Sequence, residues 1–61
     1  MKIIVVEYGG TEHHRNCKSF EFRTNKVANW MRIKYQDGSQ EMIYEIATIK
    51  AENEVEDGNN D

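Results

Sequence analysis

Residues 29–46 read NWMRIKYQ, then DG, then SQEMIYEI. Two β-rich runs flank Asp37-Gly38, and this dipeptide is typical of a two-residue hairpin turn. A type I′ turn needs a positive φ at both central residues, which Asp and Gly tolerate well. We therefore predict a β-hairpin in which Gln36 pairs with Ser39.

The two-residue turn also fixes the other pairs of the hairpin. Ile33 then faces Met42 and Met31 faces Tyr44, so this face is apolar and is expected to point inward. The opposite face pairs Lys34 with Glu41, Arg32 with Ile43 and Trp30 with Glu45. A slip by one residue would place apolar side chains beside polar ones, so the pattern favours this register.

The rest of the chain predicts further short strands. A first strand at residues 2–8 has four consecutive apolar residues, which suits a strand covered on both faces, and Gly9-Gly10 ends it. Residues 11–16 are polar and predict a loop. A second strand at residues 17–23 is followed by a turn at 24–26, and pairing Phe22 with Val27 joins it to the central hairpin as a meander.

Two readings remain for the chain after Ile46. The fourth strand either runs on to Lys50, or bends near Ile46 or Ala47 and returns to the first strand as a fifth. The predicted fold is all-β: an antiparallel meander of four to five short strands, as a small SH3-like barrel or a strongly curved sheet. It occupies residues 1–51, and residues 52–61 form an acidic tail that we expect to be disordered.

The length of 61 residues favours one small domain with a marginal core. A single cysteine, Cys17, forms no disulfide within the chain, and a partner subunit is the simplest further support. Ile43, Ile49 and Trp30 also fall off the inward face of the predicted hairpin. We therefore expect a homo-oligomer, most simply a dimer.

The lone cysteine predicts a reducing, cytoplasmic setting. The apolar run at residues 3–6 is too short for a signal peptide or a membrane span.

The charge of the chain is divided unevenly. Residues 1–51 hold eight basic and six acidic residues, a formal charge of +2. Residues 52–61 hold five acidic residues and no basic one, a charge of −5. An acidic tail of this kind usually serves only to keep a chain solvated. The sharper hypothesis is that it shields the basic body or competes with an anionic ligand for it.

Candidate binding residues alternate along the strand at residues 29–34. Trp30, Arg32 and Lys34 point outward in the predicted register, with Arg23 and Lys26 nearby. A ring between cations can stack on a base while the cations neutralise phosphates. The structural alternative is that Lys34 pairs with Glu41, Arg32 covers Ile43 and Trp30 packs in a subunit interface. This register leaves the outward face with no second aromatic ring.

From the remaining polar residues we expect no metal site, no cofactor site and no catalytic site. Adjacent His13 and His14 point to opposite faces of a strand and share one ion poorly, although His13 and Cys17 could share one on a helix. Two such ligands leave a tetrahedral site incomplete. A Cys-His nucleophile lacks an orienting third group, so we expect a non-enzymatic protein.

In general character the chain resembles the short orphan β proteins of bacteriophage genomes and mobile elements. The features that carry the likeness are its length, its meander from Met1, the strand at residues 29–35 with its Asp-Gly turn, and the acidic end. This resemblance implies a class of role: a protein of the host cytoplasm that binds and inhibits a host protein, for example a defence component. The resemblance assigns no residue to this role; the residues that we expect to contact a partner come from the predicted outward face and the turn beside it, and they are Trp30, Arg32, Lys34, Arg23, Lys26 and Ile43. The alternative is an oligomeric binder of a nucleotide, a cyclic nucleotide or single-stranded nucleic acid through the Trp/Arg/Lys face.

Overall fold

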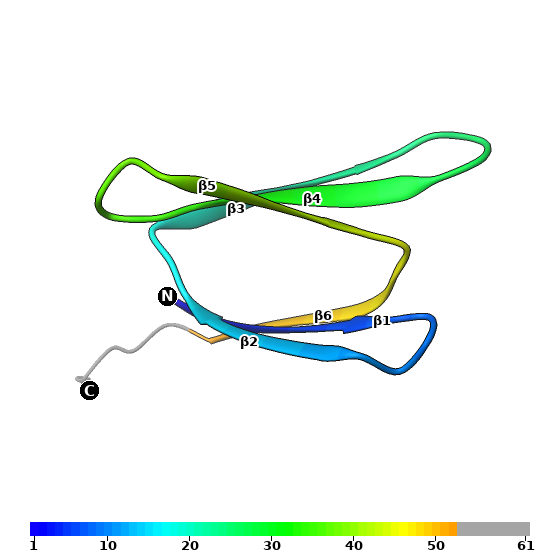
Figure 1. Cartoon of the computed structure of the whole chain (residues 1–61), viewed down its shortest axis with the longest axis horizontal. Coiled ribbons are helices and arrows are strands. Elements are labelled where there is room, and N and C mark those ends of the chain that lie inside the picture. Colours follow the sequence, from blue (N-terminus) through cyan, green and yellow to red (C-terminus); the bar gives the residue numbers. More distant parts are fainter. Residues whose placement is uncertain (53–61) are drawn as a thin grey trace, which may run out of the picture.

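The computed structural model describes residues 1–52, and these residues form six short strands and no helix. The strands are β1 (Lys2–Glu7), β2 (Glu12–Asn16), β3 (Ser19–Thr24), β4 (Asn29–Lys34), β5 (Gln40–Tyr44) and β6 (Ile46–Glu52). They make two three-stranded antiparallel sheets, ordered β2-β1-β6 and β3-β4-β5, which face each other (Figure 1). The predicted all-β class is confirmed. Of the predicted tail, Glu52 ends β6, and residues 53–61 lie outside the described part.

The chain crosses between the sheets at two places, which lie at opposite ends of the molecule (Figure 1). At the first crossing, the backbone N–H of Cys17 donates to Met1 O in one sheet, at 2.8 Å, and that of Lys18 donates to Lys34 O in the other, also at 2.8 Å. At the second crossing Glu45 alone separates β5 from β6. The two sheets are therefore linked by sharply bent strands, as in the strongly curved sheet that we predicted, and they do not close into a barrel.

The bend at Glu45 decides between the two readings of the chain end. Glu45 adopts a φ of 57° and is the one non-glycine residue with a positive φ among residues 1–52. Asn29 holds the strand that follows: its Nδ2 donates to Ile46 O at 3.0 Å, and its Oδ1 accepts from Ile46 N at 2.7 Å. β6 then pairs with β1, so the returning fifth strand is confirmed, with its bend one residue earlier than expected.

The core lies between the two sheets and is small. Alternate residues of the central strands are fully buried, and they are Ile3 and Val5 of β1 and Met31 and Ile33 of β4. Cys17, Ile43 and Ile46 complete it. Ile4 and Val6 are only half-buried on the other face of β1. We predicted a strand covered on both faces, and the structure covers only one of them fully.

The register of the central hairpin differs from the prediction by one residue. Met31 lies opposite Ile43, and Ile33 lies opposite Glu41. The turn is the cause, because Gly38 has a φ of 91° while Asp37 does not have a positive φ. Tyr35 N donates to Ser39 O at 2.9 Å and Gly38 N to Tyr35 O at 3.1 Å, which makes a three-residue loop ending in a left-handed glycine.

The slip exchanges the faces of β5. Ile43 is only 3% exposed and belongs to the core, so our expectation that it lies on the outward face is wrong. Met42 and Tyr44, which we expected to point inward, are exposed instead. The argument that Ile43 needs a partner subunit to cover it therefore loses its basis.

Two further details of the predicted meander are wrong. The polar stretch expected to be a loop contains β2, which pairs along the length of β1 from Lys2–Asn16 to Val6–Glu12. Phe22 pairs with Met31 rather than with Val27, which lies in the turn between β3 and β4. In that turn Asn25 Oδ1 accepts from the backbone N–H groups of Val27 and Ala28, each at 2.9 Å. Of Phe22, Val27, Met31 and Ile33, which the predicted pairing would place on one face, all but the turn residue Val27 do share a face, because they occupy paired or alternate strand positions.

Candidate functional site

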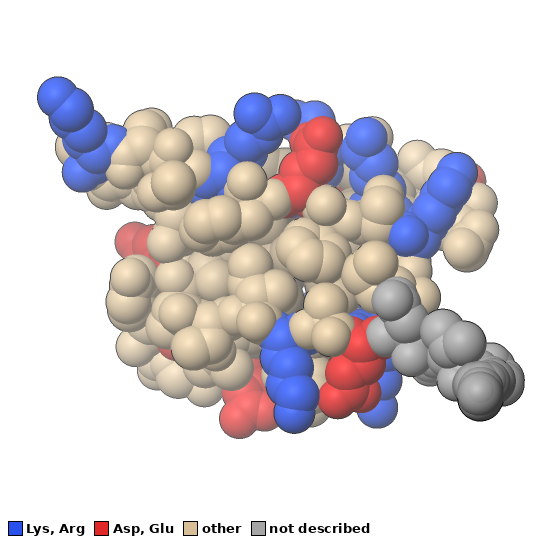
Figure 2. Space-filling view, turned by 180° about the vertical axis from the view of Figure 1, so that it is seen from behind, with Lys and Arg blue, Asp and Glu red and all other residues tan. Residues whose placement is uncertain are grey.

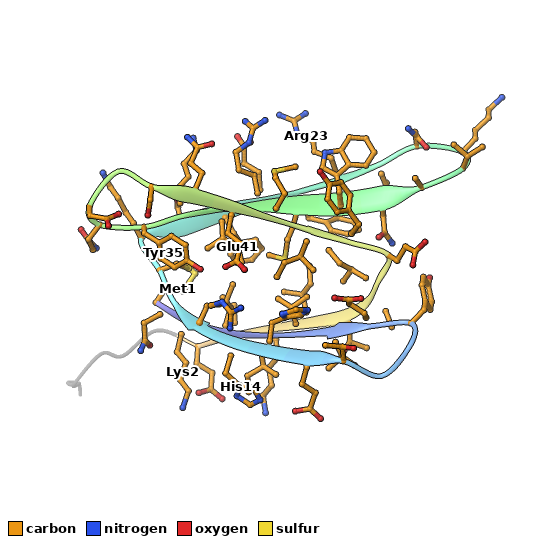
Figure 3. The ribbon with its side chains drawn as sticks, in the orientation of Figure 1. Met1, Lys2, His14, Arg23, Tyr35 and Glu41 are labelled. Carbon is orange, nitrogen blue, oxygen red and sulfur yellow. The ribbon has the colours of Figure 1, made fainter. Side chains whose placement is uncertain are left out.

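The outward face of the β3-β4-β5 sheet collects aromatic and basic side chains. Side chains alternate along a strand, so the burial of Met31 and Ile33 places Trp30, Arg32 and Lys34 on the outer side. We call this surface the aromatic–basic face, and its residues are Glu21, Arg23, Trp30, Arg32, Lys34, Met42 and Tyr44. Figure 2 shows Lys and Arg side chains along this side of the molecule, and Figure 3 labels Arg23 on the outer side of the sheet.

The pairing of the strands arranges this face in rows. Trp30 lies directly opposite Arg23 on one side and Tyr44 on the other. Arg32 lies between Glu21 and Met42 in the same way. Tyr44 is 58% exposed, so the face carries two neighbouring aromatic rings. The sequence argument missed Tyr44, because the predicted register turned it inward.

A hollow of about 280 Å³ lies on the aromatic–basic face. Its lining is formed by two cross-strand pairs, Arg23 with Trp30 and Glu21 with Arg32. Glu21 approaches both guanidinium groups at ion-pair distance, 3.9 Å to Arg23 Nη2 and 3.7 Å to Arg32 Nη1. With Lys34, the face carries three basic groups and one acidic group, a net charge of +2. It can therefore attract an anion and present a ring to a flat ligand.

Four of the six predicted binding residues lie together on this face. They are Arg23, Trp30, Arg32 and Lys34. Lys26 is exposed in the turn between β3 and β4 and does not line the hollow. Ile43 is buried and cannot touch a ligand on this surface.

A polar cluster joins the sheets at the edge formed by β2 and β5. Arg15 Nε donates to Glu41 Oε1 at 3.0 Å, Arg15 Nη2 donates to Glu41 Oε2 at 3.2 Å, and the Tyr35 hydroxyl donates to Glu41 Oε1 at 2.5 Å. Figure 3 shows Tyr35 and Glu41 close together between the two sheets. These contacts use both oxygens of Glu41, so the cluster is a structural link.

The electrostatics of this cluster follow from those contacts. The hydrogen bonds from Arg15 and then Tyr35 lower the pKa of Glu41 below its ordinary value, because both donors favour the charged carboxylate. Burial raises the pKa of Tyr35, and its hydrogen bond to Glu41 raises it further. The hydrogen bond to Glu41 likewise raises the pKa of Arg15. At neutral pH the cluster holds an ionised Arg15–Glu41 pair beside a neutral phenol.

The histidines lie on opposite sides of β2. His13 Nε2 is 2.6 Å from Glu7 Oε2, and His14 Nε2 is 3.1 Å from Glu12 Oε1. Cys17 is a buried free thiol in the core. Among residues 1–52, no group of three or more His, Cys, Asp and Glu side chains could hold a metal ion.

A second pocket, of about 550 Å³, lies at the end of the molecule near the Glu45 bend. Thr24, Asn25, Val27, Ala28, Asn29, Tyr8 and Glu45 line it. The side-chain oxygen of Asn25 and both polar atoms of the Asn29 amide are engaged with backbone groups. No Lys or Arg of residues 1–52 belongs to its lining, so this pocket, unlike the aromatic–basic face, offers no basic side chain to an anionic ligand.

Comparisons with known proteins add no constraint. No family model, curated protein or solved structure matches the chain. Within the described residues, no helix is long and apolar enough to cross a membrane. The described side chains are therefore the basis on which function is inferred.

Proposed function

We propose that this protein binds single-stranded nucleic acid on the aromatic–basic face. The observation that carries the proposal is the cross-strand pair of the half-buried Trp30 and the exposed Tyr44 on the outward face, with Arg23 and Arg32 beside Trp30. Bases of a single strand stack on aromatic rings, and each such contact contributes about 1–3 kcal/mol. Guanidinium and ammonium groups beside the rings neutralise the phosphates between the bases.

The dimensions of the face suit a short segment of such a strand. Neighbouring strands of a sheet are about 4.8 Å apart, so the paired rings of Trp30 and Tyr44 offer two adjacent platforms. Sheets that hold RNA stack two or three bases in this way. With three cations near the ligand, the logarithm of the affinity should fall with the logarithm of salt with a slope of about −2.

Fluorescence titration tests this proposal, because Trp30 is the one tryptophan of the chain. Adding oligothymidine at low salt should quench it. Tyr44→Ala should weaken binding about tenfold by removing one platform. Tyr8→Ala is the matched control, because Tyr8 is also an exposed tyrosine (75%) but lines the other pocket. An unchanged spectrum at millimolar oligonucleotide would contradict the proposal.

A second candidate is the inhibition of a host protein, which the bacteriophage resemblance implies. One observation favours it: Met42 is exposed beside the two rings and adds apolar area for which phosphate binding has no use. Tyr, Trp, Met and Arg are enriched at protein interfaces. Capture of one bacterial protein by the wild type but not by Trp30→Ala, without any oligonucleotide binding, would favour this function.

The homo-oligomer is a separate proposal, supported by Ile4 and Val6. These half-buried apolar residues lie on the outward face of β1, at the centre of the β2-β1-β6 sheet. A two-fold partner would cover them. Light scattering should give about twice the chain mass of 7.2 kDa. A value near the chain mass at high micromolar concentration would contradict the oligomer.

A further inference from the structure

The carboxylate of Glu21 would weaken binding on a surface whose only role is to bind phosphates. Glu21 lies on the outward face between Arg23 and Arg32, and its carboxylate repels a phosphate at the same place where the two arginines attract one. Its side chain is 43% exposed, so the core does not require it. A second role for this carboxylate would explain its position.

The oxygens of Glu21 have capacity for further hydrogen bonds. Its contacts with the arginines, at 3.9 and 3.7 Å, are longer than the 2.7–3.2 Å typical of a hydrogen bond. Among residues 1–52, neither these arginines nor any other group donates a hydrogen bond to this carboxylate. An ionised carboxylate accepts through two oxygens and can bind two parallel donors at once.

The hollow places this double acceptor beside a stacking surface. Glu21 and Trp30 line it together, and the two arginines complete its rim. A base that stacks on Trp30 would therefore present its edge to Glu21 and to a guanidinium group. The hollow therefore combines a ring for stacking with hydrogen-bonding groups that could distinguish one base from another.

The chemistry of the four bases selects among them. Guanine presents two adjacent donors on its Watson–Crick edge, N1–H and the N2 amino group, which match the two oxygens of a carboxylate. Its O6 and N7 are acceptors that arginine reads in a bidentate manner. Adenine and cytosine each place a ring-nitrogen acceptor beside their amino group, and thymine has a single donor between two carbonyls.

We infer that the hollow seats a guanine base, stacked on Trp30, with Glu21 accepting from its N1–H and N2 amino groups. This inference rests on the proposed nucleic-acid binding and names the base that the same face prefers. One well-placed bidentate contact discriminates by about tenfold against a wrong base. The arginines retain their phosphate contacts or bind O6 and N7.

The test uses the full chain and short oligothymidines whose central nucleotide is guanine, adenine or cytosine. Titration of Trp30 fluorescence should show about tenfold tighter binding of the guanine oligonucleotide than of the adenine one. Glu21→Gln should reduce this ratio to less than about twofold, because an amide offers only one acceptor. Glu12→Gln removes the same charge from the other sheet and should keep the ratio.

Two results would overturn the inference and leave the proposed function intact. One is equal affinity of the wild type for all three oligonucleotides. The other is a Glu21→Gln protein that binds every oligonucleotide more tightly by the same factor or keeps the guanine preference. Glu21 would then act only to neutralise the arginines. If no oligonucleotide quenches Trp30, the proposed function fails together with the inference.

Discussion

Trp30 of β4 lies directly opposite Tyr44 of β5 on the outward face of the sheet. This relationship exists because the turn at residues 36–38 contains three residues and shifts β5 by one position from the predicted register. The same shift buries Ile43 and turns Met42 outward. The surface available to a ligand is thus set by the conformation of a distant turn.

The first prediction tests this register through two neighbouring residues of β5. Ile43→Val should lower the free energy of unfolding by about 1 kcal/mol, because it removes a methyl group from the core. Met42→Ala should change it by less than about 0.5 kcal/mol, as expected for an exposed side chain. Urea denaturation of both variants measures the difference. The reverse order of the two effects would support the original register.

The second prediction concerns the turn itself. Gly38→Ala should destabilise the protein by about 1 kcal/mol, because its φ of 91° disfavours a residue with a Cβ. A Cβ at Gly38 would meet no atom within 4 Å, so crowding contributes nothing to this loss. Gly9→Ala is the control, since Gly9 has equal space and no positive φ. Equal melting temperatures for the two variants would contradict the left-handed glycine.

The agreement between the sequence predictions and the structure differs from one part of the fold to another. Alternating apolar residues correctly indicated the strands of the central hairpin. In the predicted register Ile43 and Ile49 do not fit the inward face of a single flat strand, which favours a bend; the returning strand is confirmed, although Ile43 itself lies in the core. The Asp-Gly dipeptide suits both a two-residue and a three-residue loop, and the sequence does not reveal whether Asp37 takes a positive φ. The register therefore depended on a choice that tertiary packing makes.

The failure to predict strand β2 from the sequence has a different cause. Its inward residues are His13 and Arg15, which are polar, so the stretch lacked the apolar alternation of a strand. Arg15 is satisfied by Glu41, which lies 26 residues away in the sequence. The binding residues of β4 were found because alternation within one strand is local. Tyr44 was missed because its face depends on the turn.

The third prediction is a dependence of stability on pH through Glu41. The pKa of Glu41 is lowered, so its pairing stabilises the fold above the ordinary value of 4.5, and this contribution is lost as the pH falls through the lowered pKa. Glu41→Gln should cost about 1 kcal/mol at pH 7, a modest value because the pair is one-third exposed to solvent. The free energy of unfolding of the Glu41→Gln protein should then change less than that of the wild type between neutral and acid pH. Denaturation of Glu12→Gln, an exposed control, should follow the wild-type curve, and an identical curve for Glu41→Gln would contradict the role of the cluster.

The fourth prediction concerns the acidic residues beyond β6. Residues 53–61 contain Glu54, Glu56, Asp57 and Asp61 and no basic residue. Their removal should strengthen oligonucleotide binding at low salt, and the gain should vanish at high salt because the charges are then screened. A chain of full length with these four acids changed to amides should behave like the shortened one. If only the shortened chain binds more tightly, the effect does not arise from charge.

The most direct test of nucleic-acid binding is nuclear magnetic resonance mapping of the amide groups during titration with a single-stranded oligonucleotide. We predict that the largest shifts occur in β3, β4 and β5, at Arg23, Trp30, Arg32 and Tyr44, and at the indole N–H of Trp30. The amides of the β2-β1-β6 sheet should move little, because they lie on the other side of the core. Shifts confined to that sheet, or no shifts at millimolar oligonucleotide, would contradict binding on the aromatic–basic face.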